Sequence, residues 1–241
     1  MSTTPPTNPS QPKVFMLYPT LLLDYDGTLS NTGPAILHAM NTVLAQHGCP
    51  PLTTLQGETL LSGSKRLYLF FVDLIAGCDV TEAKKLEADY MVLYERFSTT
   101  EVQLFPGVGE SVRRLHQSGR RLIVTSNKRQ NVLEAELARF GLVPFMAAII
   151  GTTPTSPRKP SRDVWTERVL KLFPGLAPSE VLCVGDTAAD IQFADVVPSA
   201  CCWAMYGYGN HAQCEALHPR YSIARFPALL PILGLGELGQ S

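Results

Sequence analysis

Short apolar runs alternate with helical patterns along most of this chain, and that alternation is the strongest constraint on its fold. The runs are continuously apolar, which is typical of strands covered on both faces of a sheet. They span Tyr18–Asp24, Arg121–Thr125, Met146–Gly151, Val181–Gly185 and Ala200–Met205, and helical spacing fills Gly109–Gln117, Asn131–Phe140, Asp163–Leu172 and Ala188–Asp195. This order predicts an α/β fold, with a Rossmann-like parallel sheet and helices on both faces.

One long interval interrupts the alternation. Residues 32–104 show no strand pattern and instead carry helical spacing in Pro34–His47, Lys65–Ala76 and Thr81–Ser98. Because this insertion follows the first strand directly, it would lie over the carboxyl ends of the strands, where open α/β sheets bind ligands. We therefore expect an α/β core from residues 14–31 and 105–241, with an all-helical cap domain over 32–104.

Composition narrows the class of protein. Residues 1–13 are mostly Ser, Thr, Pro, Asn and Gln, which predicts a disordered tail without the hydrophobic stretch of a secretory signal. A formal net charge of −1 gives no reason to expect nucleic acid as a partner, and no apolar run approaches membrane-spanning length. The six cysteines lack zinc-site spacing. We expect a cytoplasmic monomer or homodimer with reduced thiols and no membrane or nucleic-acid partner.

The first apolar run ends in two acids, Asp24 and Asp26, followed by Gly27. Residues two apart on extended backbone face the same side, so both acids can address one cleft, while the glycine permits a sharp exit. Two carboxylates this close repel each other unless a cation or a shared proton intervenes, and oxygen ligands suit magnesium. An Asp-Gly surface turn is the alternative interpretation, but the buried run that leads into it favours a site.

A second acidic pair, Asp186 and Asp190, follows the strand predicted over Val181–Gly185. Asp186 would lie beside Asp24 if the two strands are neighbours, and Asp190, four positions later in the first turn of a helix, shares its face. Taken alone, Asp186 is explained equally well as a helix cap. The two pairs together predict a shared metal site.

Two further strand ends carry groups that suit an anion. Thr125, Ser126 and Asn127 end the second strand with hydroxyl and amide groups at a helix start, where a cradle for an anion can form. Lys159 lies between two prolines after the third strand and could stabilise both a carboxylate nucleophile and a phosphoryl group. Ordinary capping and a basic loop remain the alternatives for each alone.

The order of these strand ends resembles the haloacid dehalogenase superfamily, specifically the phosphatase branch with a helical cap and, most of all, the phosphoglycolate phosphatases. The resemblance implies that Asp24 is the nucleophile, which forms an aspartyl phosphate, and that Asp26 is the general acid and base. It implies catalytic roles for Thr125 and Lys159 as well. The implied cofactor is Mg²⁺, with Asp24, Asp26 (through its backbone carbonyl), Asp186 and Asp190 at the metal, and the implied phosphate-binding residues are Gly27, Thr125, Ser126, Asn127 and Lys159.

Two places depart from the family pattern. Asn31 stands where an acidic residue is usual in the family. The segment Ser62–Arg66 resembles the substrate-specificity loop, but its sequence is unusual. Lys65 and Arg66 are candidates to bind an anionic tail of the substrate, although they also suit a solvated helix start.

Three functions fit these observations. The first is an enzyme, a phosphoric monoester hydrolase that depends on Mg²⁺ and acts on a small phosphorylated metabolite. The second is a sugar phosphomutase of the same fold. The third is a non-catalytic module that binds phosphate or carries a regulatory phosphoryl group. Retention of Asp26 favours turnover, because a long-lived acyl phosphate is better protected without an adjacent base.

Overall fold

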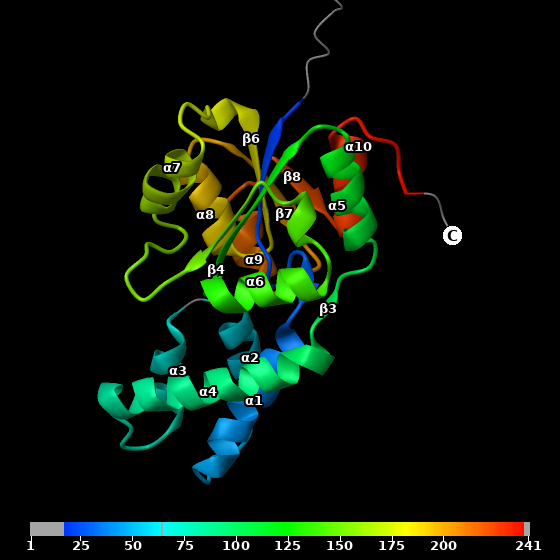
Figure 1. The fold of residues 1–241 in the computed structure, drawn as a ribbon. Coiled ribbons are helices and arrows are strands. Elements are labelled where there is room, and N and C mark those ends of the chain that lie inside the picture. Colours follow the sequence, from blue (N-terminus) through cyan, green and yellow to red (C-terminus); the bar gives the residue numbers. More distant parts are fainter. Residues whose placement is uncertain (1–16, 64, 239–241) are drawn as a thin grey trace, which may run out of the picture.

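A computed structural model describes residues 17–63 and 65–238, so the predicted tail over 1–13 lies outside the described residues. Its main sheet has six parallel strands in the order β5-β4-β1-β6-β7-β8 (Figure 1). The strands are β1 (Thr20–Leu23), β4 (Arg121–Arg129), β5 (Ala148–Thr152), β6 (Val181–Gly185), β7 (Ala200–Ala204) and β8 (Tyr221–Ile223). The predicted Rossmann-like α/β core is confirmed.

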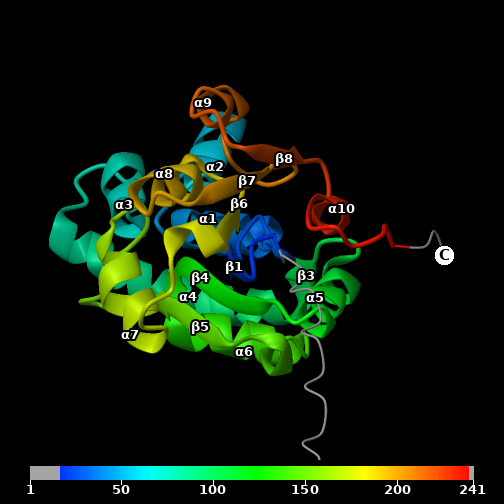
Figure 2. The same ribbon diagram turned by 90° about the horizontal axis from the view of Figure 1, so that it is seen from above.

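Helices cover both faces of this sheet (Figure 2). On one face lie α5 (Val108–Gln117), α6 (Gln130–Arg139) and α10 (Leu229–Ile232), and on the other lie α8 (Ala188–Val196) and a π-helical stretch, η2 (Val164–Val169), that runs into α7 (Leu170–Leu172). The central strand β1 explains the two layers, since Leu21 and Leu23 enter one apolar core and Leu22 enters the other. The short α9 (His211–Glu215) follows β7.

Between β1 and β4 the chain builds a second unit, here called the helical insertion. It consists of α1 (Gly33–Gln46), α2 (Thr54–Leu61), α3 (Leu67–Leu74) and α4 (Val80–Glu101). Two short antiparallel strands, β2 (Ser30–Asn31) and β3 (Gln103–Leu104), carry the chain out and back side by side. The insertion has its own apolar core and lies at the end of the sheet where β1 leads into β2 (Figure 1).

Several elements differ from the sequence prediction. Helix α2 was not predicted, although Thr53 and Gln56 form a capping box at its start, with the Gln56 Oε1 atom accepting from Thr53 N at 2.8 Å. The edge strand β8 and the pair β2–β3 were also missed, because two or three residues are too few to show a period. All six cysteines are free, and the adjacent Cys201 and Cys202 are buried in β7. Within the described residues, no helix is both long and apolar enough to cross a membrane.

Candidate active site

The strand order brings the predicted site residues to one edge of the sheet. Strand β1 lies between β4 and β6, and the Asp24 amide donates to the Val184 carbonyl at 2.8 Å, which continues the β1–β6 pairing one residue beyond the strand. In the β1–β4 register Leu23 lies opposite Val124, so Asp24 and Thr125 follow at adjacent positions. Three strand ends therefore meet in the crevice where open parallel sheets hold their ligands.

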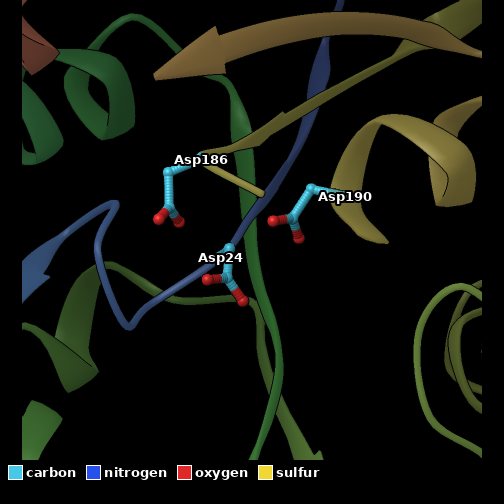
Figure 3. Close-up of side chains that lie close together, drawn as sticks. All are labelled: Asp24, Asp186 and Asp190. Carbon is cyan, nitrogen blue, oxygen red and sulfur yellow. The ribbon is translucent and has the colours of Figure 1, made fainter. Parts of the chain in front are cut away.

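Three carboxylates gather there and are called the acidic cluster: Asp24, Asp186 and Asp190 (Figure 3). One oxygen of each lies within 4.8 Å of the others, and all three side chains are buried. Burial raises the pKa of Asp24 to about 7 against the opposing effect of Lys159, and Asp190 adds to the rise. Burial raises the pKa of Asp186 as well, and the neighbouring Asp190 and Asp24 add to the rise. The cluster offers only oxygen ligands, so its residues fit a divalent cation such as Mg²⁺.

Lys159 is the positive group that the chain itself supplies to this cluster. Its Nζ atom lies 2.6 Å from Asp24 Oδ1 and 2.5 Å from Asp190 Oδ1. The side chain of Asn127 fixes the lysine backbone, because its Nδ2 donates to the Lys159 carbonyl at 3.1 Å and its Oδ1 accepts from the Lys159 amide at 2.9 Å. Burial opposes the charge on Lys159, but the two carboxylates prevail and raise its pKa above the ordinary value. The lysine is therefore a fixed ammonium beside Asp24.

Asp186 is held by groups from two loops. Thr28 Oγ1 donates to its Oδ1 at 2.9 Å, and the Tyr208 amide donates to its Oδ2 at 2.7 Å. Gly27 has a φ of +78°, and a Cβ atom there would come within 2.2 Å of Asp186 Oδ2, so this turn requires glycine. Sequence reasoning missed Thr28 and Tyr208. The run Gly207-Tyr208-Gly209 directly after a buried strand was the available signal for the latter.

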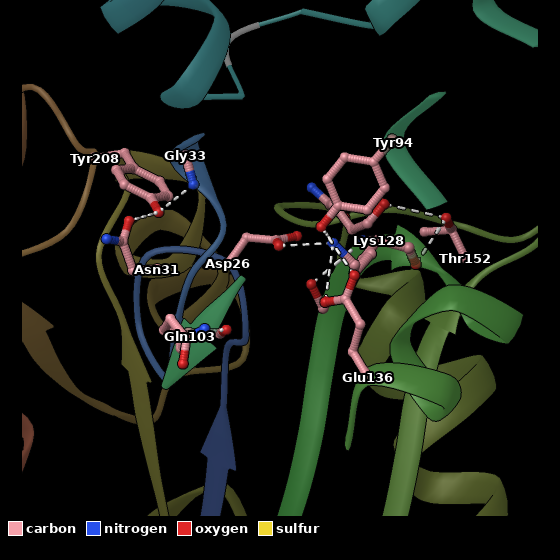
Figure 4. Close-up of polar contacts among 12 residues, drawn as sticks. Asp26, Asn31, Gly33, Tyr94, Gln103, Lys128, Glu136, Thr152 and Tyr208 are labelled. Atoms are coloured by element: carbon pink, nitrogen blue, oxygen red, sulfur yellow. Dashed lines mark hydrogen bonds and ion pairs between the residues drawn. The ribbon is translucent and has the colours of Figure 1, made fainter. Parts of the chain in front are cut away.

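Asp26 lies apart from the acidic cluster. Its Oδ1 atom pairs with Lys128 Nζ at 2.9 Å, on the side of the cleft that faces the helical insertion (Figure 4). Lys128, Tyr94 and Glu136, which surround this contact, were not among the predicted site residues. Lys128 directly follows the predicted anion cradle, which was a usable signal. For Tyr94 and Glu136 the sequence showed only the helical period of core residues.

The residues of the predicted anion cradle lie within the second half of β4 and not at a helix start, because the strand continues to Arg129 and α6 begins only at Gln130. Thr125 and Ser126 are buried, and the Ser126 hydroxyl accepts from the Lys128 amide at 3.3 Å. Thr152 from β5 donates to the carbonyls of Asn127 and Lys128 at 3.1 and 3.2 Å, which fixes the path of the chain beyond the hydroxyl groups. The cradle is thus a rigid extension of the sheet beside Asp24.

A cavity of about 980 Å³ opens between the core and the helical insertion. Asp26 and Lys128 line it from the core side, and so do Arg129 and Arg158, while Arg66 contributes from the start of α3. Lys65 is not among the described residues that line it; this lysine pairs with Asp73 on α3 and packs on the Phe70 ring. The structure therefore separates the two predicted substrate-binding cations, with Arg66 at the cavity and Lys65 paired with Asp73 of α3.

A model of the haloacid dehalogenase-like hydrolase family matches residues 21–199. The chain belongs to this family. The resemblance inferred from the strand ends is confirmed, and the protein is a hydrolase. Its similarity to curated members extends over most of its length. It is 33% identical over 173 residues to a phosphoglycolate phosphatase of Caulobacter vibrioides, covering 71% of this chain and 72% of the relative. A phosphoglycolate phosphatase of Xanthomonas campestris is 29% identical over 191 residues, with 78% and 83% covered.

Solved structures share the family fold. A protein from Haemophilus somnus, described as a predicted phosphoglycolate phosphatase, superposes with a TM-score of 0.80 at 23% identity, covering 90% of this chain and 99% of that one. The HAD-hydrolase YfnB of Bacillus subtilis, solved with bound magnesium, gives a TM-score of 0.72 at 22% identity, with 90% and 99% covered. At these identities the likeness shows the fold alone.

Proposed function

We propose that this hydrolase is a Mg²⁺-dependent phosphatase that hydrolyses a small phosphate monoester through an aspartyl phosphate on Asp24. The observation that carries the proposal is the separation of the two acids of the first motif. Asp24 is held among carboxylates and Lys159, whereas Asp26 turns to the other side of the cleft. This separation supports a division of roles in which Asp24 attacks phosphorus and Asp26 moves a proton.

In the first step a carboxylate oxygen of Asp24 attacks the phosphorus atom, and the bond from phosphorus to the ester oxygen breaks. Asp26 gives its proton to that leaving oxygen, so an alcohol departs and Asp24 carries the phosphoryl group. Lys159, at 2.6 Å from Asp24, offsets the repulsion between the carboxylate and the anionic phosphate. The hydroxyl of Thr125 and the amide of Ser126 suit the phosphoryl oxygens.

In the second step Asp26, now ionised, takes a proton from water as the water oxygen attacks phosphorus. The bond between phosphorus and Asp24 breaks, inorganic phosphate leaves, and both acids return to their starting states. Because the same residue acts first as acid and then as base, its carboxylate needs a fixed position throughout.

The residues that would hold Mg²⁺ are Asp24, Asp186 and Asp190, with the backbone carbonyl of Asp26 as a further oxygen ligand. The bound ion supplies charge neutralisation for an anionic phosphate beside an anionic nucleophile. Asp190 is shared with Lys159, so it is suited to support the site through hydrogen bonds as well as charge.

The names of the relatives and the charges around the cavity support a small anionic substrate such as phosphoglycolate. Arg66, Arg129 and Arg158 line the cavity and offer guanidinium groups to a second anionic group, such as a carboxylate. We propose that the helical insertion acts as a lid over this substrate and excludes bulk water. The proposed location is the cytoplasm.

The test combines a substrate panel with trapping of the intermediate. The protein with Mg²⁺ should release inorganic phosphate from at least one small monoester, and acid quenching with ³²P-labelled substrate should place the label on Asp24. Asp24→Asn should abolish both signals, whereas Asp195→Asn, the same change at an exposed position of α8, should retain them. Label on another residue would contradict the mechanism. Transfer to a second hydroxyl with little phosphate release would instead identify a mutase.

A further inference from the structure

Lys128 is a second buried lysine in this site, and the two chemical steps give it no role. Its side chain is 8% exposed. The Nζ atom lies 2.9 Å from Asp26 Oδ1, 2.6 Å from the Tyr94 hydroxyl and 3.5 Å from Glu136 Oε2 (Figure 4). The ammonium donates hydrogen bonds to Asp26 and Tyr94, and it forms an ion pair with Glu136 without a hydrogen bond to Oε2. The lysine is therefore held by groups from the loop after β1, from α4 and from α6.

Tyr94 and Glu136 complete the arrangement around it. The Tyr94 hydroxyl donates to Glu136 Oε1 at 2.9 Å while its oxygen accepts from Lys128. Both side chains are buried. Burial alone would lower the pKa of Lys128, but the carboxylates of Asp26 and Glu136 more than offset that effect and raise it. Lys128 therefore remains an ammonium between two acids.

This contact decides where the Asp26 carboxylate points. Lys128 anchors the Oδ1 atom, whereas Oδ2 has no hydrogen-bond partner among residues 17–63 and 65–238. Asp26 lines the cavity, and its side chain is 27% exposed. The anchored acid is thus held away from the acidic cluster and leaves one oxygen available to a ligand in the cavity.

The helical insertion contributes one member of the network. Asp26, Lys128 and Glu136 belong to the core, but Tyr94 lies on α4. The insertion also meets the core through Arg139, which donates to the carbonyls of Thr99 and Val102 at 3.2 Å. The hydroxyl of Tyr94 can reach Lys128 only while α4 lies against the core.

We infer that Lys128, Tyr94 and Glu136 are positioning residues that aim Asp26 at the leaving oxygen of the substrate. Tyr94 makes this aim depend on the position of the helical insertion. The inference rests on the proposed function, because it concerns how well Asp26 transfers a proton in that reaction.

The dependence of kcat/KM on the leaving group distinguishes a role in aiming Asp26 from a role in phosphate binding or in fold stability. Phenyl phosphate and p-nitrophenyl phosphate have nearly the same shape, but p-nitrophenol is the more acidic alcohol and needs less protonation as it leaves. Loss of a well-aimed acid should therefore reduce kcat/KM more for phenyl phosphate. A defect in phosphate binding or in folding reduces both values by the same factor.

We expect Lys128→Met to lower kcat/KM about 100-fold on phenyl phosphate and about 10-fold on p-nitrophenyl phosphate, within the usual range for general acid catalysis. Tyr94→Phe, which removes one hydroxyl group, should lower kcat/KM about 10-fold on phenyl phosphate and about twofold on p-nitrophenyl phosphate. Asp26→Asn should change the ratio in the same direction. Adding Lys128→Met to Asp26→Asn should then lower kcat/KM little further, because the lysine acts through Asp26.

Lys171→Met is the matched control, since it removes a lysine at an exposed position of α7 outside the network, and it should leave the ratio of the two esters unchanged. If the wild-type protein is active and both Lys128→Met and Tyr94→Phe lose the same factor in kcat/KM on the two esters, this inference is overturned and the proposed function is not. If Lys128→Met fails to fold, Tyr94→Phe decides. A wild-type protein inactive on both esters and on the whole panel would overturn the proposed function, and this inference with it.

Discussion

Two lysine side chains are buried beside the acids of the first motif, and they differ in which part of the molecule fixes them. Lys159 lies between Asp24 and Asp190, and its backbone is held by Asn127, so every group around it belongs to the α/β core. Lys128 lies between Asp26 and Glu136, but its shortest contact is with Tyr94 of the helical insertion.

The difference separates what the core builds by itself from what needs the insertion. Asp24, the proposed nucleophile, and Lys159 are held by residues of the core alone. Asp26, the proposed acid–base residue, is held by a network that includes Tyr94 of α4. Charge balance differs too. In the acidic cluster three carboxylates lie beside one lysine, and the cluster fits a metal cation. Lys128 lies beside two carboxylates, and neither of them belongs to that cluster.

The largest expected effect is a loss of activity on removal of Lys159, and it tests whether the two lysines have different roles. Lys159→Met should lower kcat/KM about 10³-fold, because it removes a charge that faces both the nucleophile and the phosphoryl group. The loss should be the same on phenyl phosphate and p-nitrophenyl phosphate, unlike that of Lys128→Met. Steady-state kinetics on the two esters measures it. A larger loss on phenyl phosphate would mean that Lys159 acts on proton transfer, and the two lysines would then share a role.

Stability in the presence of metal provides the next comparison. Removing either lysine leaves buried carboxylates without a cationic partner, which typically costs about 3 kcal/mol or more, a fall in Tm of roughly 6–12 °C for a chain of this size. Mg²⁺ should restore at least half of that fall in Lys159→Met, since the ion takes up the charge of the acidic cluster. It should restore little in Lys128→Met. Thermal melts with Mg²⁺ and with EDTA test this, and equal recovery in both variants would contradict the separation.

The same division governs what could be predicted from sequence. Asp24, Thr125, Lys159, Asp186 and Asp190 each follow a continuously apolar run, and parallel pairing brings the ends of such runs together whatever the details of packing. The sheet and its covering helices were predictable for that reason. The capping box of Thr53 and Gln56 held a signal for α2 that hydrophobic spacing alone does not carry.

The network around Lys128 could not be predicted in this way. It joins Asp26, Tyr94, Lys128 and Glu136 from four elements, and the order of strands does not dictate how α4 packs against α6 and β4. Tyr94 fits the apolar spacing of its helix, so the pattern marks its ring as core and says nothing of its hydroxyl group. The cavity lining depends on the same packing, which is why Lys65 and Arg66 could not be told apart by their positions in the sequence.

A smaller effect is expected where Asp186 is neutralised. Asp186→Asn should raise the Mg²⁺ concentration for half-maximal activity by about 10- to 100-fold, since a carboxylate is the better ligand for a hard cation. The Mg²⁺-induced rise in Tm should shrink in parallel, which gives a readout independent of turnover. Thr28 and the Tyr208 amide can still hold the new side chain, so the loop geometry survives. An unchanged metal requirement would remove Asp186 from the metal site.

The smallest expected effect concerns the two neighbouring cations of the insertion. Arg66 lines the cavity, so Arg66→Gln should raise KM for a substrate with a second anionic group by about two- to fivefold, the value of one exposed charged contact. Lys65→Gln is the matched control, because that lysine pairs with Asp73 of α3. Neither change should alter the ratio of phenyl to p-nitrophenyl phosphate, since both residues lie outside the network of Tyr94 and Lys128. Equal KM values for the two variants would mean that the insertion contributes to the position of Asp26 but not to the recognition of the substrate tail.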